Sequence, residues 1–269
     1  MVEVLRLEGV RKAFGGVVAV EGFSMVQPDA AITGIIGPNG AGKTTVFNLI
    51  TGVYTADCGR VVFRGKDLTG RAPHQRTHAG IARTFQNIRL FENLSVLDNV
   101  KTAYSLKVRY TLWEEMIRLP RVHREEKKID ERARGFLRYL DLERYTDQRP
   151  NNLPYGLQRR LELARALMTG PQLLLLDEPA AGLNPHEVRS LIGTINRLQK
   201  DYNLSIIIVE HHMELIMNIC SIIHVLDFGK KIAEGRPEQI KADPKVLQAY
   251  LGDAGLEAQE RGSGNDHDR

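Results

Sequence analysis

The chain has 269 residues, of which 42% are hydrophobic and 26% charged, and its formal net charge is +4. This composition is typical of a globular protein with a buried core, and it excludes collagen-like, coiled-coil and wholly disordered chains. No apolar run approaches the roughly 20 residues that cross a bilayer, and no secretory signal is expected. Two cysteines, Cys58 and Cys220, are too few for a disulfide framework or a zinc site.

The first quarter of the chain has the pattern of several strands with one helix among them. Short β-branched or apolar stretches separated by glycines predict strands or hairpins at residues 4–8, 17–26 and 61–64. A stronger strand over 31–36 runs into a glycine-rich loop at 37–42. A helix is predicted over 43–51, and Gly52 is suited to end it.

The middle of the chain is richer in long charged and apolar residues, and glycine nearly disappears from about residue 96 to 148. This composition, together with the helical spacing of the apolar residues, predicts a helical subdomain inserted into an α/β core. A turn is expected at 151–156 and an amphipathic helix at 157–169.

Strands and helices alternate in the last third. Apolar runs at 173–176 and 205–209 predict two strands, and the segment between them, around 186–200, predicts a helix. Such alternation predicts a largely parallel sheet covered by helices on both faces. The polar tail at 253–269 is expected to be disordered.

The segment GPNGAGKT, residues 37–44, matches the phosphate-binding pattern G-x-x-x-x-G-K-[ST] between a strand and a helix. Gly40 and Gly42 lack the Cβ that would keep backbone N–H groups away from a phosphate. The helix N-terminus adds N–H donors and the positive end of its dipole. Lys43 is predicted to bind the β- and γ-phosphates, and the Thr44 hydroxyl to ligate Mg²⁺. A chance glycine-rich turn is the weaker interpretation.

Two carboxylates end the apolar strand LLLLDEP at 173–179. Open α/β sheets bind ligands at this end of their strands. Asp177 is therefore predicted to hold Mg²⁺ through water, and Glu178 to polarise the water that attacks the γ-phosphate, as a general base. Taken alone, the pair has a simpler interpretation as a polar turn.

The phosphate loop and the acidic strand end together resemble those of ATP-binding-cassette (ABC) ATPases. RTFQN at 83–87 is similar to the family's glutamine loop, which implies that Gln86 contacts Mg²⁺ or the attacking water. VEH at 209–211 implies that His211 hydrogen-bonds the γ-phosphate, and AGLN at 181–184 lies where a dimer-contacting loop is expected. Phe14 matches the aromatic residue that stacks on adenine, although an isolated Phe is more often in the core.

The segment LPYGL at 153–157 resembles the family's signature loop but departs from its common LSGGQ form. Pro154 has neither a hydroxyl nor an N–H group, so the contact that the usual serine makes to the γ-phosphate of the opposite subunit must be missing. The amides of Gly156 and Leu157 remain as candidate anion donors. We expect the loop to close over ATP with backbone donors.

The resemblance covers residues 1–252 and implies a P-loop ATPase fold. That fold is α/β, with a mostly parallel sheet, an antiparallel β subdomain and an inserted α-helical subdomain at about 96–155. ATP and Mg²⁺ are the implied cofactors. The implied catalytic residues are Glu178, His211 and Gln86, and the implied metal-site residues are Thr44, Gln86 and Asp177. The implied nucleotide-binding residues are Phe14, Asn39, Gly40, Ala41, Gly42, Lys43, Thr44, Thr45, Tyr155 and Gly156.

In this family two cassettes hold two ATP molecules head to tail. The resemblance therefore implies transmembrane permease subunits and a second ABC ATPase, identical or different, as partners. It also implies a periplasmic binding protein that acts indirectly, and a peripheral position on the cytoplasmic face of the inner membrane. No nucleic-acid partner is expected.

The stretches GIARTFQNIRLF at 80–91, TTVFNLITG at 44–52 and YGLQRRLE at 155–162 are similar to the ATPase of high-affinity branched-chain amino acid importers. Urea and lipopolysaccharide ABC transporters have similar subunits and stay open as alternatives. A soluble ABC ATPase acting on nucleic acid or ribosomes is a third interpretation, although the long insertions and second cassette of such proteins are missing. A non-hydrolysing nucleotide-binding scaffold is a fourth, and Glu178 and His211 argue against it.

Overall fold

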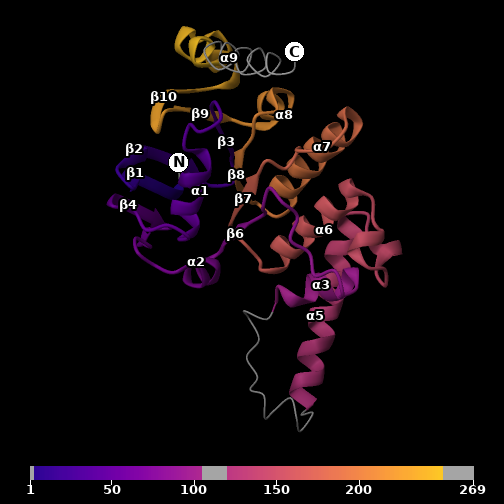
Figure 1. The fold of residues 1–269 in the computed structure, drawn as a ribbon. Coiled ribbons are helices and arrows are strands. Elements are labelled where there is room, and N and C mark those ends of the chain that lie inside the picture. Colours follow the sequence, from indigo (N-terminus) through magenta and orange to yellow (C-terminus); the bar gives the residue numbers. More distant parts are fainter. Residues whose placement is uncertain (1–2, 105–119, 251–269) are drawn as a thin grey trace, which may run out of the picture.

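The computed structural model describes residues 3–104 and 120–250 (Figure 1). The expected tail at 253–269 and the helical pattern at 113–119 lie outside the described residues. Within the described part, no helix is both long enough and apolar enough to span a membrane.

The strands form two sheets. The larger sheet has the order β10-β9-β3-β8-β7-β6, in which β10 is antiparallel to β9 and the other pairs are parallel. Its strands are β3 (Ile32–Ile36), β6 (Ile81–Arg83), β7 (Leu173–Asp177), β8 (Ser205–Val209), β9 (Ile222–Asp227) and β10 (Lys230–Gly235). The smaller sheet is antiparallel, in the order β2-β1-β4-β5. Its strands are β1 (Glu3–Phe14), β2 (Val17–Pro28), β4 (Cys58–Phe63) and β5 (Lys66–Asp67).

The helices lie between and beside these strands (Figure 1). The α-helices are α1 (Lys43–Thr51), α2 (Pro73–Ala79), α3 (Val96–Thr102), α5 (Pro120–Tyr139), α6 (Tyr155–Met168), α7 (Pro185–Asp201), α8 (Met213–Ile219) and α9 (Pro237–Ala242). Two 3₁₀ turns, η2 (Glu143–Tyr145) and η3 (Pro150–Asn152), precede α6. The parallel sheet with helices and a separate antiparallel sheet is the α/β fold of a P-loop ATPase, as predicted.

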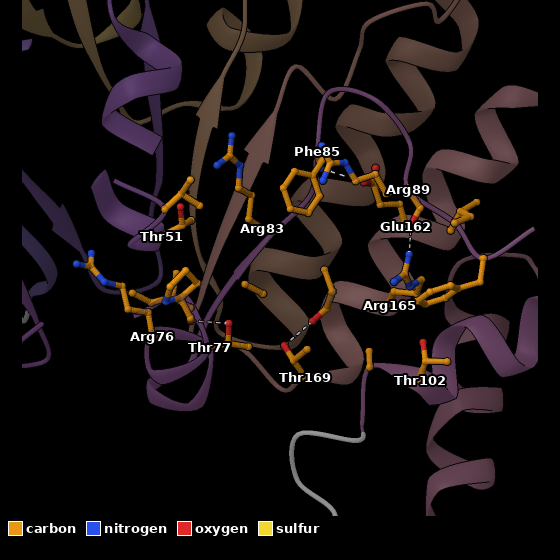
Figure 2. A pocket seen from close by; sticks show the side chains of 18 residues that line it. Thr51, Arg76, Thr77, Arg83, Phe85, Arg89, Thr102, Glu162, Arg165 and Thr169 are labelled. Atoms are coloured by element: carbon orange, nitrogen blue, oxygen red, sulfur yellow. Dashed lines mark hydrogen bonds between the residues drawn. The ribbon is translucent and has the colours of Figure 1, made fainter. Parts of the chain in front are cut away.

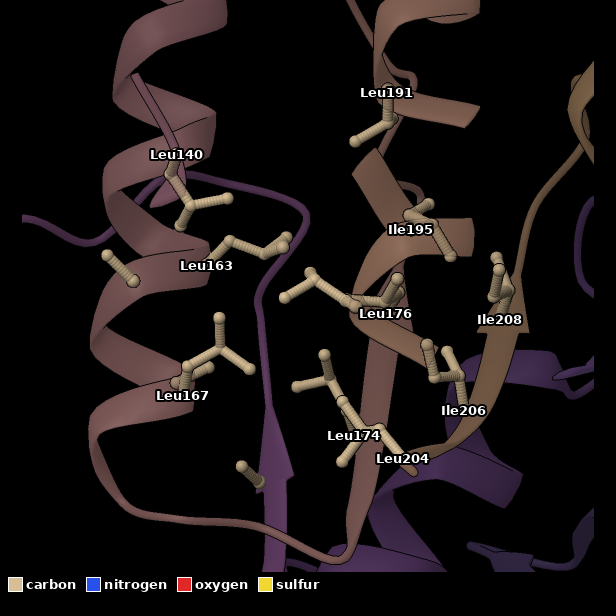
Figure 3. Packing of buried hydrophobic residues seen from close by; sticks show 14 of the residues in the cluster. Leu140, Leu163, Leu167, Leu174, Leu176, Leu191, Ile195, Leu204, Ile206 and Ile208 are labelled. Carbon is tan, nitrogen blue, oxygen red and sulfur yellow. The ribbon is translucent and has the colours of Figure 1, made fainter. Parts of the chain in front are cut away.

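Alternate side chains of the large sheet face two different cores, because successive residues of a strand point to opposite faces. Figure 3 shows the first core, where β7 and β8 pack against α6 and α7. It is built from Leu163, Leu167, Leu174, Leu176, Leu191, Ile195, Ile206 and Ile208. The same cluster continues through α3 and α5, so the helical segment after residue 96 is joined to the sheet by a continuous apolar core.

The second core lies on the other face of the large sheet. The odd-numbered residues of β7 and β8, such as Leu173 and Ile207, pack there with Val46 and Phe47 of α1. The small antiparallel sheet covers this core with Leu5 and residues of β2 and β4. Helix α1 is thereby held between the two sheets, with its N-terminus at the carboxyl end of β3.

Helix α6 begins at Tyr155, two residues earlier than the sequence predicted. Pro154 is its N-cap residue, and the Pro154 carbonyl accepts the N–H groups of Leu157 and Gln158 at 2.9 and 3.1 Å. The expected turn therefore ends at Pro154. The amide of Leu157 is used inside the chain, so the expectation that it serves as a free anion donor was wrong.

Candidate active site

The phosphate loop joins the buried strand β3 to helix α1, and its shape depends on glycine. Gly42, the N-cap of α1, has a φ of 99°, and a Cβ at this position would lie 2.4 Å from the carbonyl oxygen of Ala19. Gly37, at the start of the loop, has a Cβ position only 2.0 Å from the carbonyl oxygen of Leu226. Side chains at either position would push the loop away from the neighbouring backbone. The tight curvature that brings N–H groups together is therefore fixed by these contacts.

Lys43 lies at the first position of α1 and is only 8% exposed. Its ammonium group donates hydrogen bonds to the carbonyl oxygens of Gly37 and Pro38, at 2.6 and 2.7 Å. The side chain is thus folded back into the loop. The exposed Asn39 and Gly40 form the tip of the loop, and Gly40 has open space around its Cβ position.

Asp177, the last residue of β7, is oriented by an arginine. Nη2 of Arg83 donates to Oδ2 of Asp177 at 2.6 Å, and Nη1 donates to the side-chain oxygen of Asn48 at the same distance. The guanidinium lies over the rings of Phe47 and Phe85. The Arg83 and Asp177 side chains are both less than one-tenth exposed, so this pair is shielded from water. Arg83 therefore fixes the carboxylate through one of its two oxygens.

The three side chains predicted to be catalytic meet at one oxygen atom. Nε2 of Gln86 donates to Oε2 of Glu178 at 2.7 Å, and Nδ1 of His211 lies 3.8 Å from the same oxygen. Glu178 has a φ of 45°, in the left-handed region that non-glycine residues rarely adopt. Its N–H group donates to the carbonyl oxygen of Val209 at 2.8 Å. Strained backbone of this kind is characteristic of functional sites, where surrounding contacts hold it in place.

The signature-like segment packs against the neighbouring helix. A Cβ on Gly156 would lie 2.8 Å from Oε1 of Glu187, the residue that completes the capping box of α7. The ring of Tyr155 lies against Gly182, whose Cβ position is 3.1 Å from it. Tyr155 therefore takes a packing role toward the 181–184 loop of its own chain, while 42% of its surface stays exposed.

A buried ion pair on α6 holds the glutamine loop. Arg159 donates to the carbonyl oxygens of Phe85 and Gln86, at 2.8 and 2.5 Å, and to the hydroxyl of Tyr155 at 2.8 Å. Glu162 accepts the N–H of Phe85 at 3.0 Å and pairs with Arg159 at 3.4 Å. Burial raises the pKa of Glu162, against the opposing effects of the Phe85 N–H and Arg159. The loop that carries Gln86 is thereby fastened to α6.

Phe14 ends β1 and is 42% exposed, so it is not a core residue. Its ring meets Tyr54 edge-on, with centroids 5.0 Å apart, and the ammonium of Lys12 lies 5.5 Å from its centroid. One face of an exposed aromatic ring near a cation fits stacking with a planar heterocycle.

The donor set fits a magnesium ion that arrives with a nucleotide. Mg²⁺ prefers oxygen ligands and is usually held by one or two carboxylates together with substrate phosphates. Asp177, Thr44 and Gln86 offer a carboxylate, a hydroxyl and an amide oxygen. Over the described residues, no group of three or more His, Cys, Asp or Glu side chains is placed to hold a metal by itself. The glycine-lined loop, with the Lys43 ammonium inside it, fits a phosphate chain.

A groove of about 770 Å³ lies beside the glutamine loop (Figure 2). Phe85 lines it from that loop, Arg89 and Phe91 line it from the segment that follows, and Arg165 lines it from α6. Arg89 lies over the ring of Phe85, and Arg165 over the ring of Phe91. The groove thus presents aromatic surface with cationic groups, next to Arg83.

Sequence reasoning missed three residues whose side chains hold segments of the site: Arg83, Arg159 and Glu210, whose carboxylate accepts the N–H groups of Ala180 and His211. Each lies within a motif that the sequence analysis quoted, so its position was visible. The partners of these residues could not be predicted from the sequence, because they come from elements that are distant in the chain. Only the folded arrangement brings Arg83 to Asp177, or Arg159 to the glutamine loop.

Comparison with known proteins identifies the family of the chain. The ABC transporter family model matches residues 20–181. The chain belongs to this family of ATPases. A second family model, described as branched-chain amino acid ATP-binding cassette transporter, matches residues 230–255 of the cassette.

Two relatives of the chain are named for the transport of branched-chain amino acids. The high-affinity branched-chain amino acid transport ATP-binding protein BraF of Pseudomonas aeruginosa is 39% identical over 93% of this chain and 98% of its own length. The protein LivG of Escherichia coli K12, with the same description, matches at the same identity and coverage. A crystal structure of the ADP conformation of MJ1267, an ATP-binding cassette of an ABC transporter, superposes with a TM-score of 0.82. It is 33% identical and covers 94% of this chain and all of its own.

Proposed function

We propose that this ATPase is the energy-coupling subunit of an importer for branched-chain amino acids. One observation supports its hydrolytic chemistry above all: Gln86 and His211 converge on a single carboxylate oxygen of Glu178. The solute is inferred from the relatives named for branched-chain amino acid transport and from the family match at residues 230–255.

Each side chain has a distinct part in the proposed reaction. Lys43 and the N-terminus of α1 bind the β- and γ-phosphates, and Thr44, Asp177 and Gln86 would hold Mg²⁺, which would neutralise charge on the phosphates. Glu178 is the general base for the attacking water, and His211 binds the γ-phosphate. Phe14 stacks on adenine. The remaining phosphate-loop residues, Asn39 to Gly42 and Thr45, supply backbone and hydroxyl donors.

A second cassette, identical or different, closes the open side of the bound ATP through its signature loop. In this chain that loop contains Tyr155 and Gly156. Pro154 offers no donor there, so closure relies on the N-terminus of α6. ATP then acts as part of the interface, and hydrolysis removes the contact that holds the two cassettes together.

The aromatic and cationic groove beside the glutamine loop is the proposed docking site for a cytoplasmic helix of a permease subunit. Its position supports this assignment, because Phe85 of the groove directly precedes Gln86. A helix pressed against Phe85 would shift Gln86 relative to Glu178. The ATPase would then be peripheral, held at the cytoplasmic face of the membrane by its permeases, with a periplasmic binding protein supplying solute indirectly.

Uptake by a strain that lacks the gene tests the solute. We expect the deletion to abolish high-affinity uptake of labelled leucine, isoleucine and valine, and wild-type protein to restore it. Glu178→Gln should fail to restore uptake, whereas the matched exposed change Glu131→Gln on α5 should succeed. Loss of urea uptake with normal amino acid uptake would transfer the assignment to a urea system. An outer-membrane lipopolysaccharide defect would instead indicate an exporter.

A further inference from the structure

The residue before His211 is a carboxylate that the proposed reaction does not use. Glu210 follows β8, and its side chain is fully buried, with 0% exposure. A buried carboxylate is unfavourable unless its oxygen atoms are hydrogen-bonded. Its oxygen Oε2 lies 3.7 Å from Nδ1 of His211, so this buried carboxylate is part of the surroundings of the histidine.

Three backbone N–H groups satisfy this carboxylate. Oε1 of Glu210 accepts from Ala180 at 2.8 Å. Oε2 accepts from His211 at 2.8 Å and from His212 at 3.0 Å. The donors come from two segments about 30 residues apart in the chain: the loop after β7 and the loop after β8. One side chain therefore clamps both loops.

The two loops that Glu210 links carry Glu178 and His211, whose separation matters for the proposed reaction. Ala180 lies two residues after Glu178, whose left-handed backbone needs support. On the other side, Oε2 fixes the backbone of His211, and it lies 3.7 Å from Nδ1 of that imidazole. The imidazole is 3.8 Å from Glu178. His211 is thus placed between two carboxylates, one proposed to be catalytic and the other bound to backbone.

We propose that Glu210 is the positioning residue that sets the separation between Glu178 and His211 during ATP hydrolysis. Glu210 acts through the backbone of the loops that carry these two residues, so its effect falls on turnover rather than on ATP affinity. This inference rests on the proposed function, because it assumes the roles given to Glu178 and His211.

The amide of glutamine cannot replace this carboxylate. One of its two terminal atoms is an NH₂ group, which would face a backbone N–H donor in place of an acceptor. Either the link to Ala180 or the links to His211 and His212 must break, leaving a buried donor unsatisfied. Glu210→Gln is therefore a change of almost constant shape that releases one of the two loops.

A double-mutant cycle in the full-length protein tests the proposal. Steady-state ATPase activity is measured for wild type, Glu210→Gln, His211→Ala and the double variant. Glu214→Gln, the same chemical change at an exposed position of α8, is the control. We expect Glu210→Gln to lower kcat at least tenfold and to leave the KM for ATP within threefold. On the His211→Ala background, it should lower kcat less than twofold further.

The outcomes separate the two proposals. If His211→Ala retains wild-type turnover, the proposed function is wrong. If His211→Ala is slow but Glu210→Gln leaves kcat within twofold of wild type, or slows both backgrounds by the same factor, Glu210 is merely structural and the inference is wrong. Should Glu210→Gln not fold by circular dichroism, Glu210→Asp replaces it, with an expected loss of at least fivefold in the wild-type background and less than twofold on His211→Ala.

Discussion

His224 is a buried residue at which the pH dependence of stability can be tested. It lies on β9 with no exposed surface, its Nδ1 is 3.3 Å from Oε2 of Glu234, and its ring meets Phe23 edge-on. Lys231 also donates to Glu234, at 2.5 Å. Burial lowers the pKa of His224 from 6.5 to about 4, and Glu234 only partly opposes this effect.

The sign of the resulting pH effect follows from proton binding. Between pH 6.5 and about 4, the unfolded chain binds a proton at His224 that the folded chain does not, so the free energy of unfolding falls as the pH falls through this window. The ionisation of His224 alone should lower the free energy of unfolding by about 2 kcal/mol between pH 7 and pH 5. Urea unfolding of His224→Leu should show a drop smaller by that amount than wild type. His78→Leu, at an exposed position of α2, should show the wild-type drop, and an equal drop in all three proteins would contradict the prediction.

At the residue scale, the resemblance of short segments to family motifs pointed to side chains that lie close together in the structure, but not to the residues that contact and hold them. Gln86, Glu178 and His211 were each identified from a short segment, and they lie together in the structure. Arg83 bonds Asp177 of the neighbouring strand β7, and Glu210 bonds the amide of Ala180 in the loop after β7. Such contacts have no signature in a single sequence, because a local pattern records only which neighbours share a strand or helix.

At the element scale, the ion pair of Arg159 and Glu162 is the testable feature. Both side chains are less than one-tenth exposed, and together they bond the backbone of Phe85 and Gln86. Removing one partner leaves the other charge buried and unpaired, which costs about 3 kcal/mol or more. We expect Arg159→Met to lower the free energy of unfolding by about that amount and to speed hydrogen exchange at the Phe85 amide.

The neighbouring Arg160 supplies the control. It pairs with Asp141 at the surface and is 27% exposed, so Arg160→Met should cost about 1 kcal/mol or less. Hydrogen exchange at Phe85 should stay at the wild-type rate in this variant. A loss of stability in Arg159→Met no greater than in Arg160→Met would show that the glutamine loop is not fastened to α6 by this pair.

Element boundaries were predicted well where a strong period or a glycine marked them. Helix α1 begins at Lys43 and ends at Thr51, as its pattern and Gly52 indicated. The start of α6 was wrong by two residues, because a proline at the N-cap uses its carbonyl for the first helical bonds and so belongs to the helix boundary rather than to the turn. Strand β6 was missed because three residues, Ile81–Arg83, carry no period of their own. Its pairing with β7 makes it a strand.

At the scale of the whole molecule, the parallel sheet explains why the site lies where it does. The strands β3, β7 and β8 run in the same direction, so their carboxyl ends meet at one edge. The phosphate loop follows β3, Asp177 and Glu178 lie at the end of β7, and Glu210 and His211 follow β8. The alternation of strands and helices predicted this edge as the ligand site. The packing of the antiparallel sheet over α1 depended on contacts between distant segments, and it required the structure.

The proposed sandwich predicts a change of assembly state with nucleotide. In the proposed sandwich, a second cassette closes the γ-phosphate side of the ATP bound to the first, so ATP that cannot be hydrolysed should hold the pair together. Glu178→Gln keeps the shape of the side chain and removes the general base. We expect this variant to elute as a monomer with ADP and as a dimer with MgATP in size-exclusion chromatography, while wild type returns to monomer as it hydrolyses ATP.

Adding Lys43→Ala to Glu178→Gln should abolish the dimer, because without the ammonium inside the loop the triphosphate is no longer bound. A Glu178→Gln protein that binds MgATP but stays monomeric would exclude a pair of identical cassettes, and the same elution test would then be applied to this chain mixed with a second, different ABC ATPase.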